Sequence, residues 1–328
     1  MSTTTQKLSD EQIVKGIHSY QRKLKLIKNI SELLWILPFI VLAVSVLTRA
    51  FSGTTVVLFL VVLVISITLS LFISKKREPT VKKMNCFVGE NVVKEIIAEK
   101  IEIEKYAPDK FLKRSYIENS NIVPGFDTIS GSDYIKGTYK GVEIVYCDLK
   151  LERIDKRDSQ GEKTYEVETV FQGHFISLKM SKMMEGYVKI KERRNPRKEK
   201  GFFDDVVDGI AGMVGIGAGN RRIEVESVAF NNQFEISTSN DEMAFYILTP
   251  QFMENIVKAD ALADGYTNIR FKGTDIDISI NNGKDSFEID KTMYSVKRLA
   301  ESRDRMRRDL DVVLAIVDEI LEKERLFE

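Results

Sequence analysis

The chain has 328 residues, and its 49 lysines and arginines balance 49 aspartates and glutamates, so it has no net formal charge at neutral pH. Nucleic-acid-binding proteins usually show a basic bias, so this balance argues against nucleic acid as a partner. The two cysteines, Cys86 and Cys147, are too few for a disulfide framework. The two histidines, His18 and His174, leave little material for a histidine-rich metal site.

Residues 1–32 predict a cytoplasmic amphipathic leader helix. Ser9 and Gln12 have the spacing of a capping box, in which two side chains satisfy the first backbone groups of a helix. Apolar residues then recur at alternating spacings of four and three, which is typical of a helix that packs against another helix. These residues are Ile13, Ile17, Tyr20, Leu24 and Ile27.

Residues 33–74 predict a hairpin of two transmembrane helices. Arg49 is the only charged residue in this range, and about 20 apolar helical residues cross a bilayer. We therefore expect crossings over roughly 33–48 and 56–73, joined by a tight turn. A cleaved signal peptide is the alternative. It is disfavoured because about 30 polar residues precede the apolar run and a second apolar segment follows the first.

Lysine and arginine residues predict the orientation of the hairpin. Cytoplasmic segments next to a membrane carry an excess of these residues. They flank both chain ends of the hairpin, whereas the turn contains only Arg49; the flanking residues are Lys7, Lys15, Arg22, Lys23, Lys25, Lys28, Lys75, Lys76, Arg77, Lys82 and Lys83. The expected location is the inner (cytoplasmic) membrane, with two crossings, both termini cytoplasmic and the turn outside.

Residues 75–110 predict a juxtamembrane helix. Glu78-Pro79 is expected to break the helix after the second crossing, because helical geometry is disfavoured for the residue before a proline. A helical apolar pattern follows and ends at Ala107-Pro108-Asp109; its residues are Val92, Val93, Ile96, Ile97 and Ile103. We expect this helix and the leader to pair as an antiparallel extension of the hairpin.

Residues 111–328 predict a cytoplasmic α+β domain with a mainly antiparallel sheet. Residues 134–146 have the pattern of a strand, a tight turn and a second strand. More strands are expected over 165–180, 187–191, 222–230, 234–239, 269–271, 276–280 and 287–289, with turns at Asn231-Asn232 and Lys272–Asp275. Turns separate most of these strands and few helices do, which favours antiparallel pairing.

Two helices are expected to pack on this sheet. Met243–Leu248 is an apolar run that leads through Thr249-Pro250 from a strand into a helix over 250–260. Thr249 is suited to cap that helix, and Pro250 to occupy its first position. Residues 294–324 predict a long C-terminal helix with an apolar stripe that Arg303 interrupts.

The sequence shows no catalytic, cofactor-binding or metal-binding motif. Gly209–Gly219 is rich in glycine, but no Lys-Ser/Thr pair follows it, so a flexible linker within 201–220 is favoured over a phosphate loop. His174 lies in an alternating strand pattern and is interpreted as a structural histidine, although pairing can bring Glu168 or Asp148 near it. Cys86 and Cys147 are interpreted as reduced thiols.

Residues 202–214 contain the candidate contact site. Their apolar residues recur on one helical face, and Asp204, Asp205 and Asp208 lie on the other. An acidic face is unfavourable on an anionic membrane surface, so packing within the domain, or disorder, is favoured over membrane contact. If the face is exposed, Phe202, Phe203, Val206 and Ile210 are the candidates for contact with a partner or membrane.

Several segments resemble a bacterial family of unknown function, the domain-of-unknown-function family numbered 3137. The resemblance is carried by Phe171-Gln172-Gly173, Asn231–Ile236, Asp241–Met253, Phe271-Lys272-Gly273 and Phe287-Glu288. It extends over about two thirds of the chain. It implies a membrane-anchored cytoplasmic domain and supplies no catalytic residues. Core and cap residues make up these motifs, which favours a shared fold over a shared reaction.

Two functional hypotheses follow from these patterns. The first is a membrane-anchored cytoplasmic binding or scaffold module in a bacterial cell, with the lipid bilayer and a protein as partners. The second is a membrane-bound hydrolase whose site is assembled from distant acidic residues and His174. A polar cleft that joins His174 to two carboxylates would favour the hydrolase, and a filled core at His174 would favour the binding module.

Overall fold

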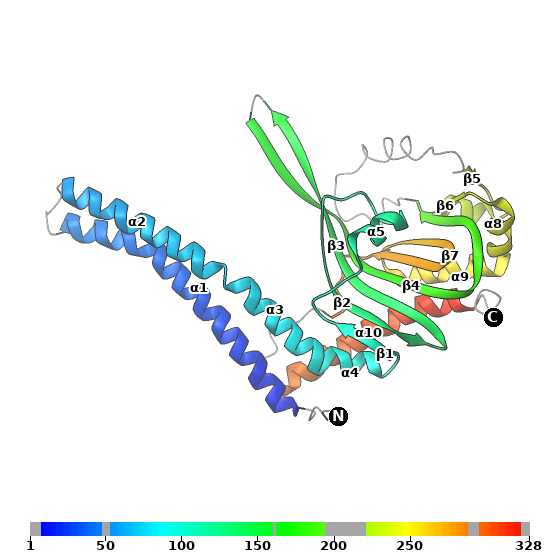
Figure 1. Ribbon diagram of the computed structural model, residues 1–328, viewed down its shortest axis with the longest axis horizontal. Coiled ribbons are helices and arrows are strands. Elements are labelled where there is room, and N and C mark those ends of the chain that lie inside the picture. Colours follow the sequence, from blue (N-terminus) through cyan, green and yellow to red (C-terminus); the bar gives the residue numbers. More distant parts are fainter. Residues whose placement is uncertain (1–7, 48–52, 160–161, 194–220, 288–294, 323–328) are drawn as a thin grey trace. The chain divides into compact units, whose positions relative to one another are not determined.

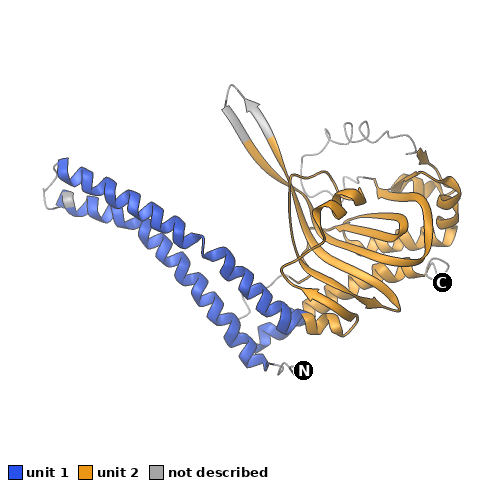
Figure 2. Cartoon of the chain, in the orientation of Figure 1, with its two compact units in different colours: residues 1–93, 289–303 blue, residues 94–288, 304–328 orange. Residues whose placement is uncertain are grey.

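The computed structural model describes residues 8–47, 53–159, 162–193, 221–287 and 295–322. It divides into two compact units (Figure 2). Unit 1 comprises residues 1–93 and 289–303, and unit 2 comprises residues 94–288 and 304–328. Figure 1 shows the order of the helices and strands along the chain.

Unit 1 is built on α1 (Asp10–Leu47), α2 (Gly53–Ser74) and α3 (Arg77–Val88), and a π-helical turn, η1 (Gly89–Val93), follows α3. Two of its helices are long and apolar enough to cross a membrane. α1 continues through Pro38. The break after α2 falls at Lys75 and Lys76, so Glu78-Pro79 lies in the first turn of α3, where the missing proline N–H costs no helical hydrogen bond.

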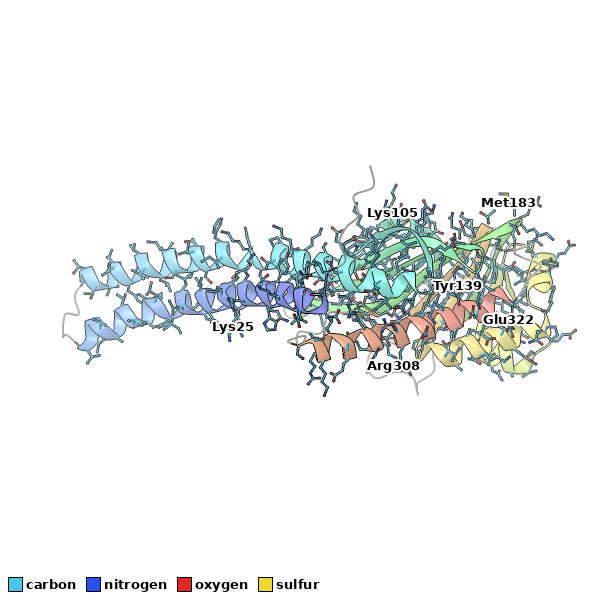
Figure 3. All side chains as sticks on the ribbon, turned by 90° about the horizontal axis from the view of Figure 1, so that it is seen from below. Lys25, Lys105, Tyr139, Met183, Arg308 and Glu322 are labelled. Carbon is cyan, nitrogen blue, oxygen red and sulfur yellow. The ribbon has the colours of Figure 1, made fainter. Side chains whose placement is uncertain are left out.

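α1 pairs antiparallel with α2 and α3. Ser31 Oγ lies 2.7 Å from Ser70 Oγ of α2, and the rings of Tyr20 and Phe87 of α3 lie 5.9 Å apart. Gly16 permits the close approach, because a Cβ there would lie 2.5 Å from the Phe87 ring. Ile13 and Ile17 are buried and Lys25 is exposed (Figure 3). The expected pairing of the leader is thus confirmed for α3.

The helix expected over 75–110 is shorter than predicted. α4 (Lys94–Ala98) is its last helical part, and β1 (Glu102–Ala107) is a strand that pairs with β2. Backbone hydrogen bonds to a neighbouring strand here outweigh the helical preference of glutamate and lysine.

Unit 2 contains an antiparallel sheet of seven strands, in the order β1-β2-β3-β4-β6-β5, with β7 paired to β4. The remaining strands are β2 (Thr128–Tyr139), β3 (Val142–Ser159), β4 (Glu162–Glu192), β5 (Arg221–Ile223), β6 (Phe234–Thr238) and β7 (Tyr266–Asn281). The predicted turn between β2 and β3 is confirmed. Lys140 and Gly141 have φ values of 50° and 82°, as in a two-residue hairpin turn. The predicted α+β class is therefore confirmed.

β4 joins the two strands expected over 165–180 and 187–191. Its pairing register shifts between Lys179 and Tyr187, and β4 curves around β7 (Figure 1). β7 doubles back near Gly273, as the hydrogen bond between the Asn268 and Ser279 side chains indicates. In a straight strand, residues eleven apart would lie about 36 Å apart. The hairpin expected around Lys272–Asp275 is thus confirmed.

Two segments of unit 2 predicted as strands form helices. Val228–Gln233 is α7, capped by Ser227, so the strand expected over 222–230 shortens to β5. Asp241–Ile247 is α8, and the Asn240 side chain accepts a hydrogen bond from the Met243 N–H, 3.1 Å away. Side-chain caps satisfy the first backbone donors of these helices and so favour helices over the predicted strands.

The cap at Thr249 joins two helices, α8 and α9 (Pro250–Ala263), and not a strand and a helix as expected. The predicted long C-terminal helix is confirmed as α10 (Val296–Leu321). Its Asp318 carboxylate binds Tyr139 and Lys140 at the β2–β3 turn, at 3.3 and 2.6 Å. Phe287 lies in a turn, and the rest of the expected last strand lies outside the described residues.

The hydrophobic core of unit 2 includes a cluster between β3, β4 and α5 (Arg114–Ser120). It consists of Ile117, Ile122, Cys147, Leu149, Leu151, Phe171 and Phe175. A second contact joins Phe252 of α9 edge-on to Phe271 of β7, with ring centroids 6.0 Å apart. These contacts fix β3 and β4, which carry the polar residues described next.

Candidate functional site

A buried polar cluster surrounds His174 on the paired strands β3 and β4. Asp148 lies directly opposite His174 in the strand register, and Tyr146 points to the same side as Asp148 because alternate strand residues share a face. His174 and Asp148 are only 2% and 3% exposed. Of the two carboxylates considered from the sequence, the structure brings Asp148 to His174. Glu168 instead pairs with Arg153 at 2.7 Å.

The partners of His174 assign its tautomer. Nδ1 lies 2.6 Å from Asp148 Oδ1, so Nδ1 carries the proton and its N–H donates a hydrogen bond to the carboxylate. Nε2 lies 3.3 Å from Asn282 Nδ2 and accepts a hydrogen bond from that amide. The Tyr146 hydroxyl donates to the same Asp148 oxygen at 2.7 Å, and its ring stacks on the imidazole with centroids 5.8 Å apart. Both ring nitrogens are thus satisfied.

Two more acidic residues approach Asp148. Asp133 lies at a bulge of β2, and Asp285 lies in the turn after β7. Each of the three residues offers one oxygen within 4.8 Å of the others. The Tyr106 hydroxyl donates to Asp133 Oδ1 at 2.6 Å. Burial, followed by the negative charge of Asp148, raises the pKa of Asp133 to about 8.

A second buried polar group lies between β7 and α5. The Arg270 guanidinium binds Asp277 Oδ2 through Nε at 3.0 Å and also through Nη2, and it donates from Nη1 to the Asn119 carbonyl at 2.7 Å. The Tyr116 hydroxyl donates to the other Asp277 oxygen at 2.8 Å. Burial and the charge of Asp277 raise the pKa of Tyr116. This group fastens β7 to α5.

The residues named from the sequence do not assemble into a catalytic site. Phe202, Phe203, Val206 and Ile210, with the glycine-rich segment, lie outside the described residues. Cys147 is fully buried, and burial raises the pKa of its thiol to about 12, which keeps it protonated and unreactive. Cys86 is half-buried and is not in a disulfide.

His174 is buried, and hydrogen bonds engage both of its ring nitrogens. A general base needs a free nitrogen within reach of the proton that it removes. Both His174 ring nitrogens are hydrogen-bonded, and the His174 side chain is only 2% exposed. Sequence reasoning missed Tyr106, Asp133, Tyr146 and Asp285, because they come from separate segments with no shared spacing.

Comparison with known proteins gives a family match. The family model described as "Protein of unknown function (DUF3137)" matches residues 169–321, which confirms the resemblance over that segment. The match is shorter than the expected two thirds of the chain and does not include the two apolar helices of unit 1. No curated protein matches the chain.

One solved structure matches, the mycobacterial trehalose monomycolate transport factor A. The identity is 10% and the TM-score is 0.31, with 70% of this chain and 95% of that chain covered.

Proposed function

We propose that this protein is a membrane-anchored binding or scaffold module that presents its α+β unit on the cytoplasmic side of a bacterial inner membrane. The observation that carries the proposal is the exposure of large apolar side chains along α1 and α2. Trp35, Phe39 and Phe72, for example, are 53%, 58% and 61% exposed. Side chains of this kind are unfavourable in water and suit the hydrocarbon of a bilayer.

A surface recess in unit 1 supports contact with the lipid interface. It has a volume of about 560 Å³ and is mainly apolar. Tyr20, Pro79 and Phe87 line it, together with Lys82 and Lys83. Aromatic rings and lysines are the residues that favour the headgroup region next to a transmembrane helix.

Cysteine labelling in whole cells tests the proposed orientation. A membrane-impermeant maleimide is expected to label a cysteine that replaces Ser52, in the turn between the crossings, and not one that replaces Ser159 of β3, because the charge pattern places the turn outside. Native Cys86 serves as an internal control, since it is half-buried and lies on the proposed cytoplasmic side. Labelling at position 159 without labelling at 52 would contradict the orientation.

A binding role is favoured over hydrolysis by the enclosure of His174, described above. The anchor also gives a binding module a specific advantage. Tethering confines the α+β unit to the membrane surface and raises its effective concentration for partners there. We assign the contact with a protein partner to Phe202, Phe203, Val206 and Ile210, on their amphipathic pattern in the sequence.

Replacing these four residues with serine is expected to reduce partner recovery at least severalfold in co-purification from mild detergent, quantified by mass spectrometry. The matched control replaces Val228 and Phe245 with serine, since these are exposed apolar residues elsewhere in unit 2, at 71% and 54%. The control should retain its partners. Equal partner recovery from both variants would contradict the assignment of the contact to this segment. Substrate turnover that is lost in a separate variant, His174→Ala, would favour the hydrolase.

A further inference from the structure

Three carboxylates converge at one point of unit 2 that the binding role does not use. Asp133 of β2, Asp148 of β3 and Asp285 of the turn after β7 each place one oxygen within 4.8 Å of the other two. Asp133 and Asp148 are buried, at 6% and 3% exposure, whereas Asp285 is half-buried. The group therefore has two fixed members in the protein interior and one member toward solvent.

Asp148 supplies a second and separate observation. Its Oδ1 accepts hydrogen bonds from the Tyr146 hydroxyl and from His174 Nδ1. Its Oδ2 is buried and has no hydrogen-bond partner. Buried polar atoms are nearly always paired, so an unpaired oxygen on one of three converging carboxylates points to a positively charged ligand.

Neighbouring side chains hold the carboxylates in place. The Tyr106 hydroxyl donates to Asp133 Oδ1 at 2.6 Å, and Tyr146 and His174 hold Asp148 at 2.7 and 2.6 Å. Metal sites commonly have such an outer set of hydrogen bonds, which orients the ligands before the ion arrives. Here the outer hydrogen-bond donors, Tyr106, Tyr146 and His174, bind one oxygen of Asp133 and one of Asp148.

We propose that Asp133, Asp148 and Asp285 bind a divalent cation of the calcium class. All three ligands are carboxylate oxygens, which hard cations prefer. The three oxygens lie within 4.8 Å of one another, and Ca²⁺ accepts such carboxylate oxygens in flexible coordination, whereas Mg²⁺ demands near-ideal octahedral geometry. Water would complete the coordination on the half-buried side of Asp285.

Terbium luminescence tests the site on the full chain in detergent micelles. Tb³⁺ substitutes for Ca²⁺, and the rings of Tyr106 and Tyr146, whose hydroxyls bind two of the ligands, are close enough to sensitise its emission. The wild-type protein is expected to give saturable emission on tyrosine excitation, and excess Ca²⁺ should displace it. Asp285→Asn is expected to weaken Tb³⁺ binding by about tenfold or more.

Asp264→Asn is the matched control. Its side chain is 81% exposed and pairs with Lys284, and it is not one of the three proposed ligands. This variant should bind Tb³⁺ as the wild type does. Asp133→Asn tests a buried ligand, and circular dichroism checks that this variant folds. If it does not fold, the comparison relies on Asp285→Asn, because Asp285 is half-buried and its replacement disturbs the core less. Absence of saturable emission in the wild type, or equal affinity in Asp285→Asn and Asp264→Asn, would overturn the proposal.

Discussion

Replacing Asp277 with alanine is expected to destabilise unit 2 by about 3–5 kcal/mol, because it leaves the Arg270 guanidinium buried without its counter-charge. Asp277 is fully buried and Arg270 is 9% exposed. The same change removes the acceptor of the Tyr116 hydroxyl. Hydrogen–deuterium exchange of the peptides over β7, with chemical denaturation of the full chain in detergent, measures the effect.

The matched control is Glu118→Ala. Glu118 pairs with Arg114 at 2.7 Å, but both side chains are 46% exposed. Water screens such a pair, so its removal is expected to cost less than about 1 kcal/mol. The double variant Arg270→Met/Asp277→Leu removes both buried charges and should recover most of the lost stability. Equal losses in Asp277→Ala and Glu118→Ala would show that the buried pair is not important to β7.

The elements that the sequence predicts well are specified by local patterns. The charge-free run over 33–74 predicts α1 and α2, since only Arg49 interrupts it. Lys140-Gly141 predicts the β2–β3 turn, because few residues other than glycine tolerate its backbone geometry. The apolar stripe of α10 predicts a helix to within a few residues at each end. In each case the information lies within one segment.

The errors have two physical sources. At α7 and α8, the Ser227 and Asn240 side chains cap a helix in segments that the sequence predicted as strands. Residues 102–107 form the strand β1 because their backbone pairs with β2, and the local sequence does not reveal that pairing. A single apolar run such as Met243–Leu248 carries too little periodicity to separate a strand from one turn of helix.

The candidate site was only partly predictable. Asp148 was named as a possible neighbour of His174, and the register of β3 and β4 places them opposite each other. Tyr116 and Asp277 are 161 positions apart in the chain, and no spacing rule joins them. A charged residue within an apolar strand, such as Arg270 in β7, is the one local signal that marks a buried pair.

Arginine at positions 61 and 64 together is expected to abolish the second crossing. Val61 and Val64 lie near the middle of α2 and are 49% and 60% exposed, so they face the proposed lipid phase. Each arginine at the centre of a transmembrane helix opposes insertion by about 2.5–3.5 kcal/mol, or about 5–7 kcal/mol for the pair. A carbonate wash of isolated membranes should then release the protein, or an outside reagent should reach a cysteine at position 159.

The matched control makes the same change on unit 2. Val257 of α9 and Val312 of α10 are 36% and 41% exposed, and arginine there would face water. Val257→Arg/Val312→Arg should stay in the washed membranes with position 159 unlabelled from outside. The α2 variant differs from it only in where the charges lie, so a difference between the two reports the environment of α2. If Val61→Arg/Val64→Arg also resists extraction with position 159 protected, α2 does not cross the membrane and the proposed anchor is wrong.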